Sequence, residues 1–233
     1  MVHDLKQAAK GLLSTPTFTL GAIATLALGI GAAVATFSVV HSVVLKDLPY
    51  SDPDRLVTVW PEVNYNIAMV DETLDAIPGL ESLTGSSGWG FVLTDGPRPT
   101  EIDGRRVTPG HFEMLGVLPL LGRSFEASDA LPDAPGVTIL SHALWVEAFG
   151  GGPDVLGRMI QLSGADREVH EVVGVMPAGF RPTQGEPLLW TTLRGEPGTA
   201  PADDDTWFVN TRIGRLAEGA THEVVSQQLR TFA

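Results

Sequence analysis

The sequence predicts an α+β protein, with one membrane-spanning helix followed by a mixed domain of short strands and helices. No charged residue occurs between Lys10 and Lys46, and most of that stretch is apolar. Beyond it, strand-like and helix-like patterns alternate without the regular spacing of βαβ units, which favours the α+β class. The 26 glycines and 17 prolines among 233 residues indicate many turns and short elements.

Residues 17–45 are predicted to form the membrane helix. About 20 apolar residues cross a bilayer core of roughly 30 Å, and the apolar stretch from Phe18 to Leu45 is longer than that. A cleaved signal peptide is one alternative, because Ala33-Val34-Ala35 fits a small-x-small cleavage site. The apolar run continues past that site, however. A core helix of a soluble protein is the other alternative, but no second segment is apolar enough to surround it.

The charge distribution predicts how the chain is oriented. Residues 1–46 hold three lysines and one acid, a net charge of +2, whereas residues 47–233 hold twelve arginines, no lysine and 27 acids, a net charge of −15. The positive-inside rule then places the N-terminus in the cytoplasm and residues 46–233 outside the inner (plasma) membrane, with a single pass through the lipid bilayer. Such an acidic domain lacks the basic face that nucleic-acid binding requires.

Small and apolar residues suggest further roles for the N-terminal part. Residues 1–16 are expected to form a cytoplasmic amphipathic segment on the inner leaflet, ended by Pro16. Its apolar face consists of Val2, Leu5, Ala9, Leu12 and Leu13. Within the span, small residues at i, i+4 spacing let helix backbones approach closely. The residues predicted to pack against helices of another chain, or of a missing C-terminal part, are Gly21, Gly29, Gly31, Ala33 and Ala35.

Local patterns predict the elements of residues 46–233. Residues 46–55 are a polar, proline-rich linker. Single strands are expected at residues 56–60, 101–107, 137–140 and 207–213. Residues 159–162 and 168–176 are expected to form a hairpin. The pattern of residues 82–94 is ambiguous. Helices are expected at 71–77 with Asp71 as N-cap, at 111–115, after Ser141 until Gly150, and after Thr221 with Val225, Leu229 and Phe232 on one face.

The motifs of common enzymes are missing from the sequence. There is no cysteine, no phosphate-binding loop and no H-x-x-x-H pair among the six histidines. Gly29-Ile-Gly31 lacks the third glycine of a dinucleotide fingerprint, and Gly85-Ser-Ser-Gly88 lacks the spacing of a nucleophile elbow. Asp203-Asp204-Asp205 is better explained as a solvated loop than as a cation site. We therefore expect no enzyme activity and no catalytic, cofactor or metal residue.

Several motifs occur in the order found in one family. They are Leu26-Ala-Leu-Gly-Ile-Gly-Ala-Ala33, Leu48-Pro-Tyr-Ser-Asp-Pro-Asp-Arg-Leu-Val57, Val107-Thr-Pro-Gly-His-Phe-Glu-Met-Leu-Gly-Val117, Val137-Thr-Ile-Leu-Ser-His-Ala-Leu-Trp145 and Val172-Val-Gly-Val-Met-Pro177. With them the sequence resembles MacB/FtsX-type ABC transporter permeases, in particular the acidobacterial-type duplicated permeases. The resemblance covers nearly the whole chain.

The resemblance implies a first membrane helix, a periplasmic core domain with a ferredoxin-like part and an inserted second part, and three more membrane helices. Family members dimerise and work with a cytoplasmic ABC ATPase, whose motion reaches the outer domain for export or partner activation. Because the last three helices are absent from the sequence, we expect the N-terminal part of a permease, with the domain at 46–233 truncated at its C-terminus. A membrane-anchored binding or interaction module is the alternative, and an anchored enzyme is disfavoured.

Overall fold

The computed structural model describes residues 16–43, 50–59, 65–66, 68–95, 98–164, 169–194, 208–209 and 211–232. The chain divides into two compact units, Met1–Leu48 and Pro49–Ala233. Nearly all of the amphipathic segment expected at residues 1–16 lies outside the described residues. The predicted division into residues 1–16, 17–45 and 46–233 stays a prediction.

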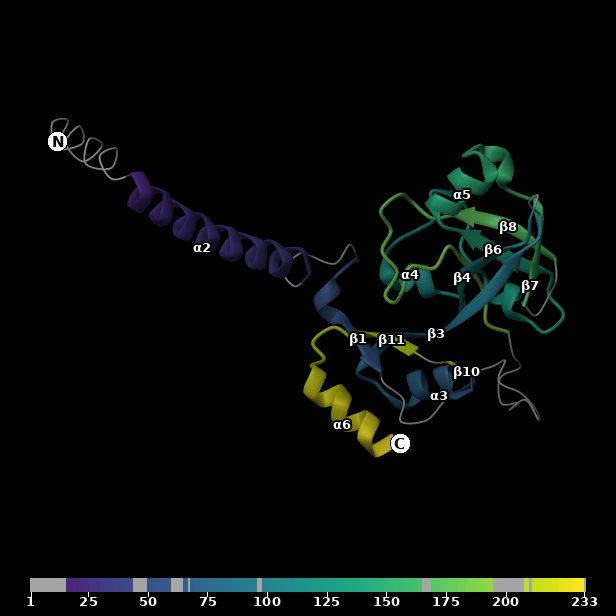
Figure 1. Cartoon of the computed structure of the whole chain (residues 1–233). Coiled ribbons are helices and arrows are strands. Elements are labelled where there is room, and N and C mark those ends of the chain that lie inside the picture. The colour runs from purple at the N-terminus through teal and green to yellow at the C-terminus, as the bar shows by residue number, and fades with distance from the viewer. Residues whose placement is uncertain are drawn as a thin grey trace. The chain divides into compact units, whose positions relative to one another are not determined.

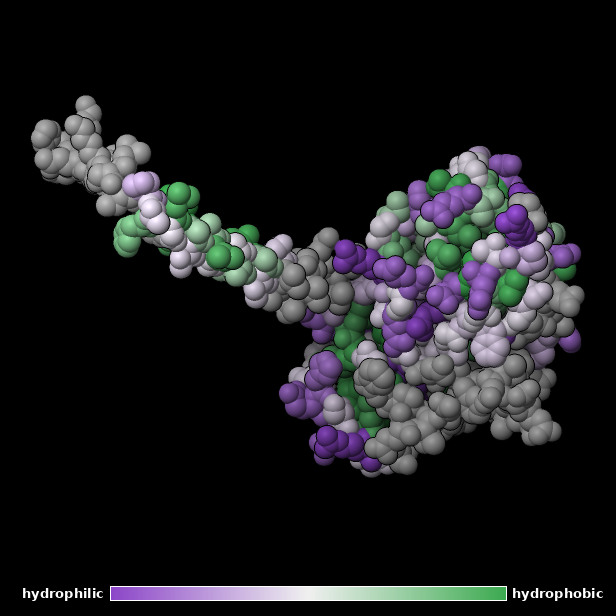
Figure 2. All heavy atoms as spheres, in the orientation of Figure 1, coloured by the Kyte–Doolittle hydropathy of each residue, from purple (hydrophilic) through white to green (hydrophobic). Residues whose placement is uncertain are grey.

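The first unit contains one long apolar helix, α2 (Pro16–Val43). Its part from Pro16 to Ser38 is long and apolar enough to cross a membrane, with a mean hydropathy of 2.0. Within the described part of the chain, no other helix is both long and apolar enough to do so. Figure 2 colours its side chains mostly green to pale. The hydroxyls of Thr25 and Thr36 donate to the carbonyls of Gly21 and Ala32, both at 2.9 Å, so these polar groups are satisfied within the helix, as a lipid environment requires.

The second unit contains the following elements (Figure 1). The strands are β1 (Leu56–Val59), β2 (Tyr65–Asn66), β3 (Leu80–Leu93), β4 (Thr100–Val107), β5 (Leu121–Gly122), β6 (Gly136–Leu140), β7 (Met159–Ser163), β8 (Val169–Val175), β9 (Leu189–Thr192), β10 (Phe208–Val209) and β11 (Thr211–Leu216). The α-helices are α3 (Ala68–Ala76), α4 (His111–Leu115), α5 (His142–Phe149) and α6 (His222–Phe232), and short 3-10 turns lie at Pro53–Arg55, Ala127–Ala130 and Pro153–Val155. Strands and helices are mixed as expected, which confirms the α+β class.

One lobe is built from β1, α3, the first half of β3, β11 and α6. Strand β11 lies between β1 and β3 and runs antiparallel to both, so β1 and β3 are parallel and α3 connects them. This is a split βαβ arrangement, and we call it the split βαβ lobe. Its helices and sheet enclose one apolar core, made of Val57, Val59, Val70, Ile77, Leu80, Leu83, Leu193, Leu216 and Val225.

The other lobe is inserted between β3 and β11 and contains a closed ring of strands. The ring runs β3-β4-β9-β6-β8-β7 and returns to β3 through the pairs Val92↔Ser163 and Leu93↔Leu162. We call it the barrel lobe. Closure leaves no open strand edge in the ring, and inward-facing apolar side chains fill it. Its core includes Phe91, Ile102, Leu140, Ile160, Leu162, Val172 and Leu189.

Strand β3 belongs to both lobes. Its residues 80–86 pair with β11, and its residues 86–93 pair with β4. The segment was ambiguous in the sequence because it is rich in glycine and serine. Small residues suit the place where the lobes meet, since Ser86 and Ser87 are buried there. Further along, a Cβ on Gly104 of β4 would lie 2.5 Å from the Phe91 ring, so glycine makes room for that ring.

Several predicted elements are confirmed. Helix α4 spans the predicted residues, β6 contains the predicted strand, and β7 and β8 form the predicted antiparallel hairpin. Helix α5 begins after Ser141, whose Oγ accepts a hydrogen bond from the Leu144 N–H at 3.1 Å. Helix α6 begins after Thr221, whose hydroxyl accepts from the Val224 N–H at 3.4 Å.

Two predictions were wrong. Helix α3 begins at Ala68, so Asp71 lies inside it and does not cap it. The single strand predicted for residues 207–213 is split, because β10 pairs with β2 in a separate two-stranded sheet and β11 begins at Thr211. Alternation along the sequence also failed to predict exposure in β11, where all six residues are buried.

Candidate coupling site at the start of the domain

The first described residues of the second unit, 50–55, form what we call the attachment segment. It turns sharply at Asp52, whose φ of +43° and ψ of +61° lie in the left-handed region. Among the described residues, Asp52 is the only non-glycine residue with positive φ, a conformation that aspartate tolerates better than most side chains. The turn is closed by a hydrogen bond from the Arg55 N–H to the Asp52 carbonyl at 3.0 Å. The segment therefore enters β1 through a defined turn.

Arg215 of β11 binds the attachment segment to the core of the domain. Its guanidinium donates to the carbonyls of Ser51 at 2.7 Å, Asp52 at 3.3 Å and Met114 at 2.6 Å. Arg215 is only 7% exposed, so these carbonyl dipoles replace much of the water that the cation has lost. One side chain thus joins β11, the end of α4 and the attachment segment.

A tight backbone contact lies beside this arginine. The Ser51 N–H donates to the Leu115 carbonyl at 3.1 Å. Gly116, which ends α4, has a φ of +71°, and a Cβ on it would lie 2.0 Å from the Ser51 Oγ. Only glycine allows both this backbone conformation and this approach.

Two further side chains hold the ends of the attachment segment. The Nε of Arg55 donates to the Leu216 carbonyl at 2.9 Å, and its guanidinium also pairs with Glu81. The hydroxyl of Tyr50 donates to the Arg181 carbonyl at 2.5 Å, and the ring packs in the cluster around Met114. Burial raises the pKa of Tyr50, so the phenol stays a hydrogen-bond donor.

The contact at Arg181 connects the attachment segment to a loop of the barrel lobe, residues 177–188. Arg105 of β4 donates to the Gln184 carbonyl at 3.1 Å and to its side-chain oxygen at 3.0 Å, which also accepts from Thr211 at 2.9 Å. The loop and the start of α5 enclose an open cavity of about 630 Å³ that Met176 and Trp190 also line. The attachment segment is therefore hydrogen-bonded, through Tyr50 and the Arg181 carbonyl, to a loop that lines this cavity.

The buried histidines act as structural groups. His111 is within 3.2 Å of the Thr84 hydroxyl, and burial, together with the charge of Arg105, lowers its pKa to about 4. The pKa of His170 is also lowered to about 4, by burial and by the charges of Arg194 and Arg106. Both imidazoles are therefore neutral at pH 7. His142 begins α5 and meets the Trp145 ring edge-on, with ring centroids 5.3 Å apart.

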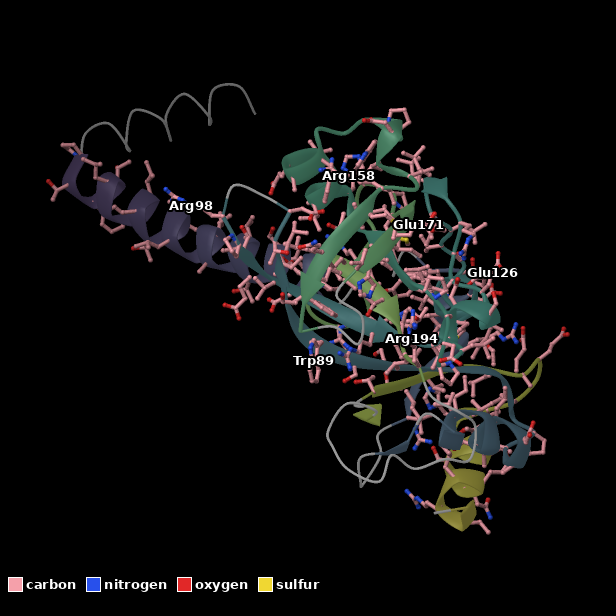
Figure 3. The ribbon with its side chains drawn as sticks, turned by 90° about the vertical axis from the view of Figure 1, so that its right-hand side faces the viewer. Trp89, Arg98, Glu126, Arg158, Glu171 and Arg194 are labelled. Carbon is pink, nitrogen blue, oxygen red and sulfur yellow. The ribbon has the colours of Figure 1, made fainter. Side chains whose placement is uncertain are left out.

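Acidic side chains of the described residues do not gather around one point. Figure 3 shows Glu126, Glu171, Arg158 and Arg194 spread over the barrel lobe. Within the described ranges, no group of three or more histidine, aspartate or glutamate side chains is placed to hold a metal ion. Asp203-Asp204-Asp205 and Glu168 lie outside the described residues.

The predicted helix-packing residues all lie on α2. Gly21, Gly29, Gly31, Ala33 and Ala35 are exposed on the helix, and a Cβ on any of the three glycines would touch nothing within 4 Å. Residues two apart on a helix lie on nearly opposite faces. The pairs Gly29/Ala33 and Gly31/Ala35 therefore belong to different faces, so packing on both would need two neighbours. This packing stays a prediction.

The described residues thus combine an apolar helix of membrane-spanning length with, in the second unit, a split βαβ lobe that carries an inserted barrel. The family model of the MacB-like periplasmic core domain matches residues 19–232. The chain belongs to this family, the MacB/FtsX-type ABC transporter permeases. No curated protein matches it significantly in sequence.

Solved structures share the fold. The periplasmic region of MacB from Actinobacillus actinomycetemcomitans is 13% identical over 76% of this chain and 82% of its own, with a TM-score of 0.58. The extracellular domain of the noncanonic ABC-type transporter YknZ from Gram-positive bacteria is 13% identical over 74% of this chain and 86% of its own, with a TM-score of 0.51. A domain assigned to a permease protein from Porphyromonas gingivalis is 18% identical over 78% of this chain and 84% of its own, with a TM-score of 0.55.

Proposed function

We propose that the chain is the motion-transmitting N-terminal part of a MacB/FtsX-type permease. Helix α2 is anchored in the inner membrane with its N-terminus in the cytoplasm, and a cytoplasmic ABC ATPase moves the helices. The attachment segment passes this displacement to the periplasmic domain, for export or for activation of a partner. The observation that carries the proposal is the binding of Arg215 to the carbonyls of Ser51, Asp52 and Met114.

The contacts of the attachment segment reach both lobes. Arg215 and Leu216 belong to β11 of the split βαβ lobe, whereas Leu115 and Arg181 belong to the inserted barrel lobe. A flexible linker would absorb the movement of a membrane helix. A segment held by hydrogen bonds on both sides passes the movement on, because packed elements shift as rigid bodies.

The proposal needs partners that the sequence does not contain. The three further membrane helices come from the remainder of a permease or from a second permease chain, and the assembly is a dimer, as in the family. The small-residue faces of α2 are the contact surfaces for these helices. The expected ATPase contact is supplied by the same remainder.

The test measures movement of the domain relative to the helix. The chain has no native cysteine, so spin labels can be attached at Thr17→Cys and Leu131→Cys alone. The labelled chain is reconstituted in proteoliposomes with the remaining permease helices and an ABC ATPase. Addition of ATP should change the distance between the labels in the parent, and Arg215→Gln should reduce that change.

Controls separate coupling from folding. Arg98→Gln removes an exposed arginine of the barrel lobe and should leave the ATP-dependent change intact. Tyr50→Phe removes only the hydrogen bond to Arg181 and should weaken the change without unfolding the domain. A parent that shows no ATP-dependent change, or variants at Arg215 and Tyr50 that behave like Arg98→Gln, would contradict the proposal and favour an anchored interaction module.

A further inference from the structure

The cavity beside α5 has a floor that the loop at residues 177–188 covers in part. Met176 and Trp190 line the cavity, yet Met176 is 0% and Trp190 1% exposed. Phe180 of the loop packs against the apolar cluster that contains both residues, and its ring centroid lies 5.6 Å from that of Trp190. The access of a molecule to the floor therefore depends on where the loop holds Phe180.

Two glycines divide the loop. Gly179 and Gly185 have φ values of +79° and +62°, and a Cβ on either would meet no atom within 4 Å, so packing does not restrain the backbone at these positions. Hinges are a few loop positions of this kind, where φ and ψ can change. We call the residues between them, 180–184, the gate segment. The Tyr50 hydroxyl donates to its middle, at the Arg181 carbonyl.

The side chain of Gln184 fastens one end of the gate segment to both lobes. Its side-chain oxygen accepts from Arg105 of β4 at 3.0 Å and from the Thr211 hydroxyl of β11 at 2.9 Å. The Nε of Arg105 also donates to the Gln184 carbonyl at 3.1 Å, and its Nη1 donates to the Ser86 hydroxyl at 3.2 Å, where β3 passes from one lobe to the other. A single oxygen atom thus depends on donors from the barrel lobe and from the split βαβ lobe.

We propose that the gate segment is a lid over the cavity floor and that the Gln184 side chain holds this lid closed. Because its two donors belong to different lobes, a change in the relative position of the lobes breaks at least one of the two hydrogen bonds. The lid then turns about Gly179 and Gly185 and carries the Phe180 ring away from Trp190. The proposal concerns the second unit alone and stands whether or not the attachment segment transmits motion.

The test measures how fast a thiol on the cavity floor reacts. Met176→Cys supplies the only thiol of the chain, which has no native cysteine, and a maleimide labels the full chain in detergent. Gln184→Leu keeps the size of the side chain but removes the acceptor, whereas Gln184→Glu keeps an acceptor for both donors. Labelling should be about tenfold faster with Gln184→Leu, because a hydrogen bond to a charged donor is lost. It should stay at the parent rate with Gln184→Glu.

A control distinguishes opening of the lid from general loosening of the fold. Ile160→Cys places the thiol in the core of the barrel lobe, at a residue that is buried and does not line the cavity. Gln184→Leu should leave its labelling rate unchanged. An equal increase at Ile160→Cys, no increase at Met176→Cys, or the same increase with Gln184→Glu would each overturn the proposal.

A second measurement does not require a substitution in the floor. Ala143 of α5 and Arg181 of the gate segment both line the cavity and are exposed, so each accepts a spin label after mutation to cysteine. The distance between the labels should lengthen or become more broadly distributed with Gln184→Leu and stay as in the parent with Gln184→Glu. A distribution that Gln184→Leu leaves unchanged would also overturn the proposal.

Discussion

Gly116 and Ser51 are so close that a methyl group on the glycine would lie 2.0 Å from the serine hydroxyl oxygen. The contact joins the end of α4 to the attachment segment, the part of the domain nearest in sequence to the membrane helix. Tight packing of this kind depends on one residue type at one place.

Gly116→Ala should destabilise the domain by about 2 kcal/mol or more, because alanine is strained at positive φ and its methyl group displaces Ser51. Gly110→Ala is the matched control, since Gly110 also has a positive φ, +81°, but has no atom within 4 Å of a built Cβ. It should cost only about 1 kcal/mol. Urea unfolding measures the loss of stability in each of the two variants. The contact with Ser51 would be unimportant if the two variants lost the same stability.

Arg215→Lys should lower the free energy of unfolding by about 2–4 kcal/mol, because lysine cannot reproduce the three guanidinium hydrogen bonds and leaves buried carbonyls unpaired. Arg230→Lys, an exposed change on α6, should stay within about 0.5 kcal/mol. The midpoints of denaturant unfolding of the two variants are compared with that of the parent. Similar values for both would show that the Arg215 contacts contribute little to the folded state.

Stability should fall as the pH drops from about 6.5 to about 4. The pKa values of His111 and His170 are about 4 in the folded state, below the usual 6.5, so the unfolded chain binds more protons in this range. The full stability is present above pH 6.5, and each histidine contributes a loss of at most about 3 kcal/mol. His111→Asn with His170→Asn should flatten the profile of unfolding free energy against pH. An unchanged slope in the double variant would exclude these residues as its cause.

Alkaline phosphatase fused after Ala233 should be active, and a reporter that fluoresces only in the cytoplasm should be dark at the same position. The reason is the net charge of +2 for residues 1–46 and −15 for residues 47–233, which favours a cytoplasmic N-terminus. Fusions at Lys10 should give the reverse pattern. A fluorescent fusion at Ala233 would show that the domain is cytoplasmic and would remove the basis for the proposed function.

Gly31→Leu should still insert into the membrane but associate less with co-expressed permease helices. Leucine favours the bilayer, whereas its side chain prevents close approach of a second helix. Gly29→Leu tests the opposite face, and Ile30→Leu is a volume-conserving control. Co-purification compares the three variants. If Gly31→Leu associates as well as Ile30→Leu, the helix serves only as an anchor on that face.

Local signals predicted the helices well. Ser141 and Thr221 are N-caps, and the apolar spacing after each of them is helical, so the start of α5 and of α6 could be read from neighbouring residues. The same holds for the uncharged run that becomes α2. Asp71 was misleading because a residue of capping type is also tolerated inside a helix, and α3 begins earlier.

Long-range structure could not be predicted in the same way. The ring of strands closes through pairs such as Leu93↔Leu162, which are distant in sequence. No signal in the sequence indicated that Arg215 holds the attachment segment, because arginine is mostly an exposed residue type. Its three acceptors, the carbonyls of Ser51, Asp52 and Met114, are backbone atoms that any sequence contains. Only the folded chain brings them together.

The length of strand β3 has a mechanical consequence. Its 14 residues extend over about 43 Å at roughly 3.3 Å per residue, and neighbouring strands stiffen it along its length. Such a strand acts as a lever arm. A rotation of about 5° at its Leu80 end would displace its Leu93 end by about 4 Å over that length. A small tilt of the split βαβ lobe would thus become a displacement as large as an atomic contact at the Leu93 end of the strand.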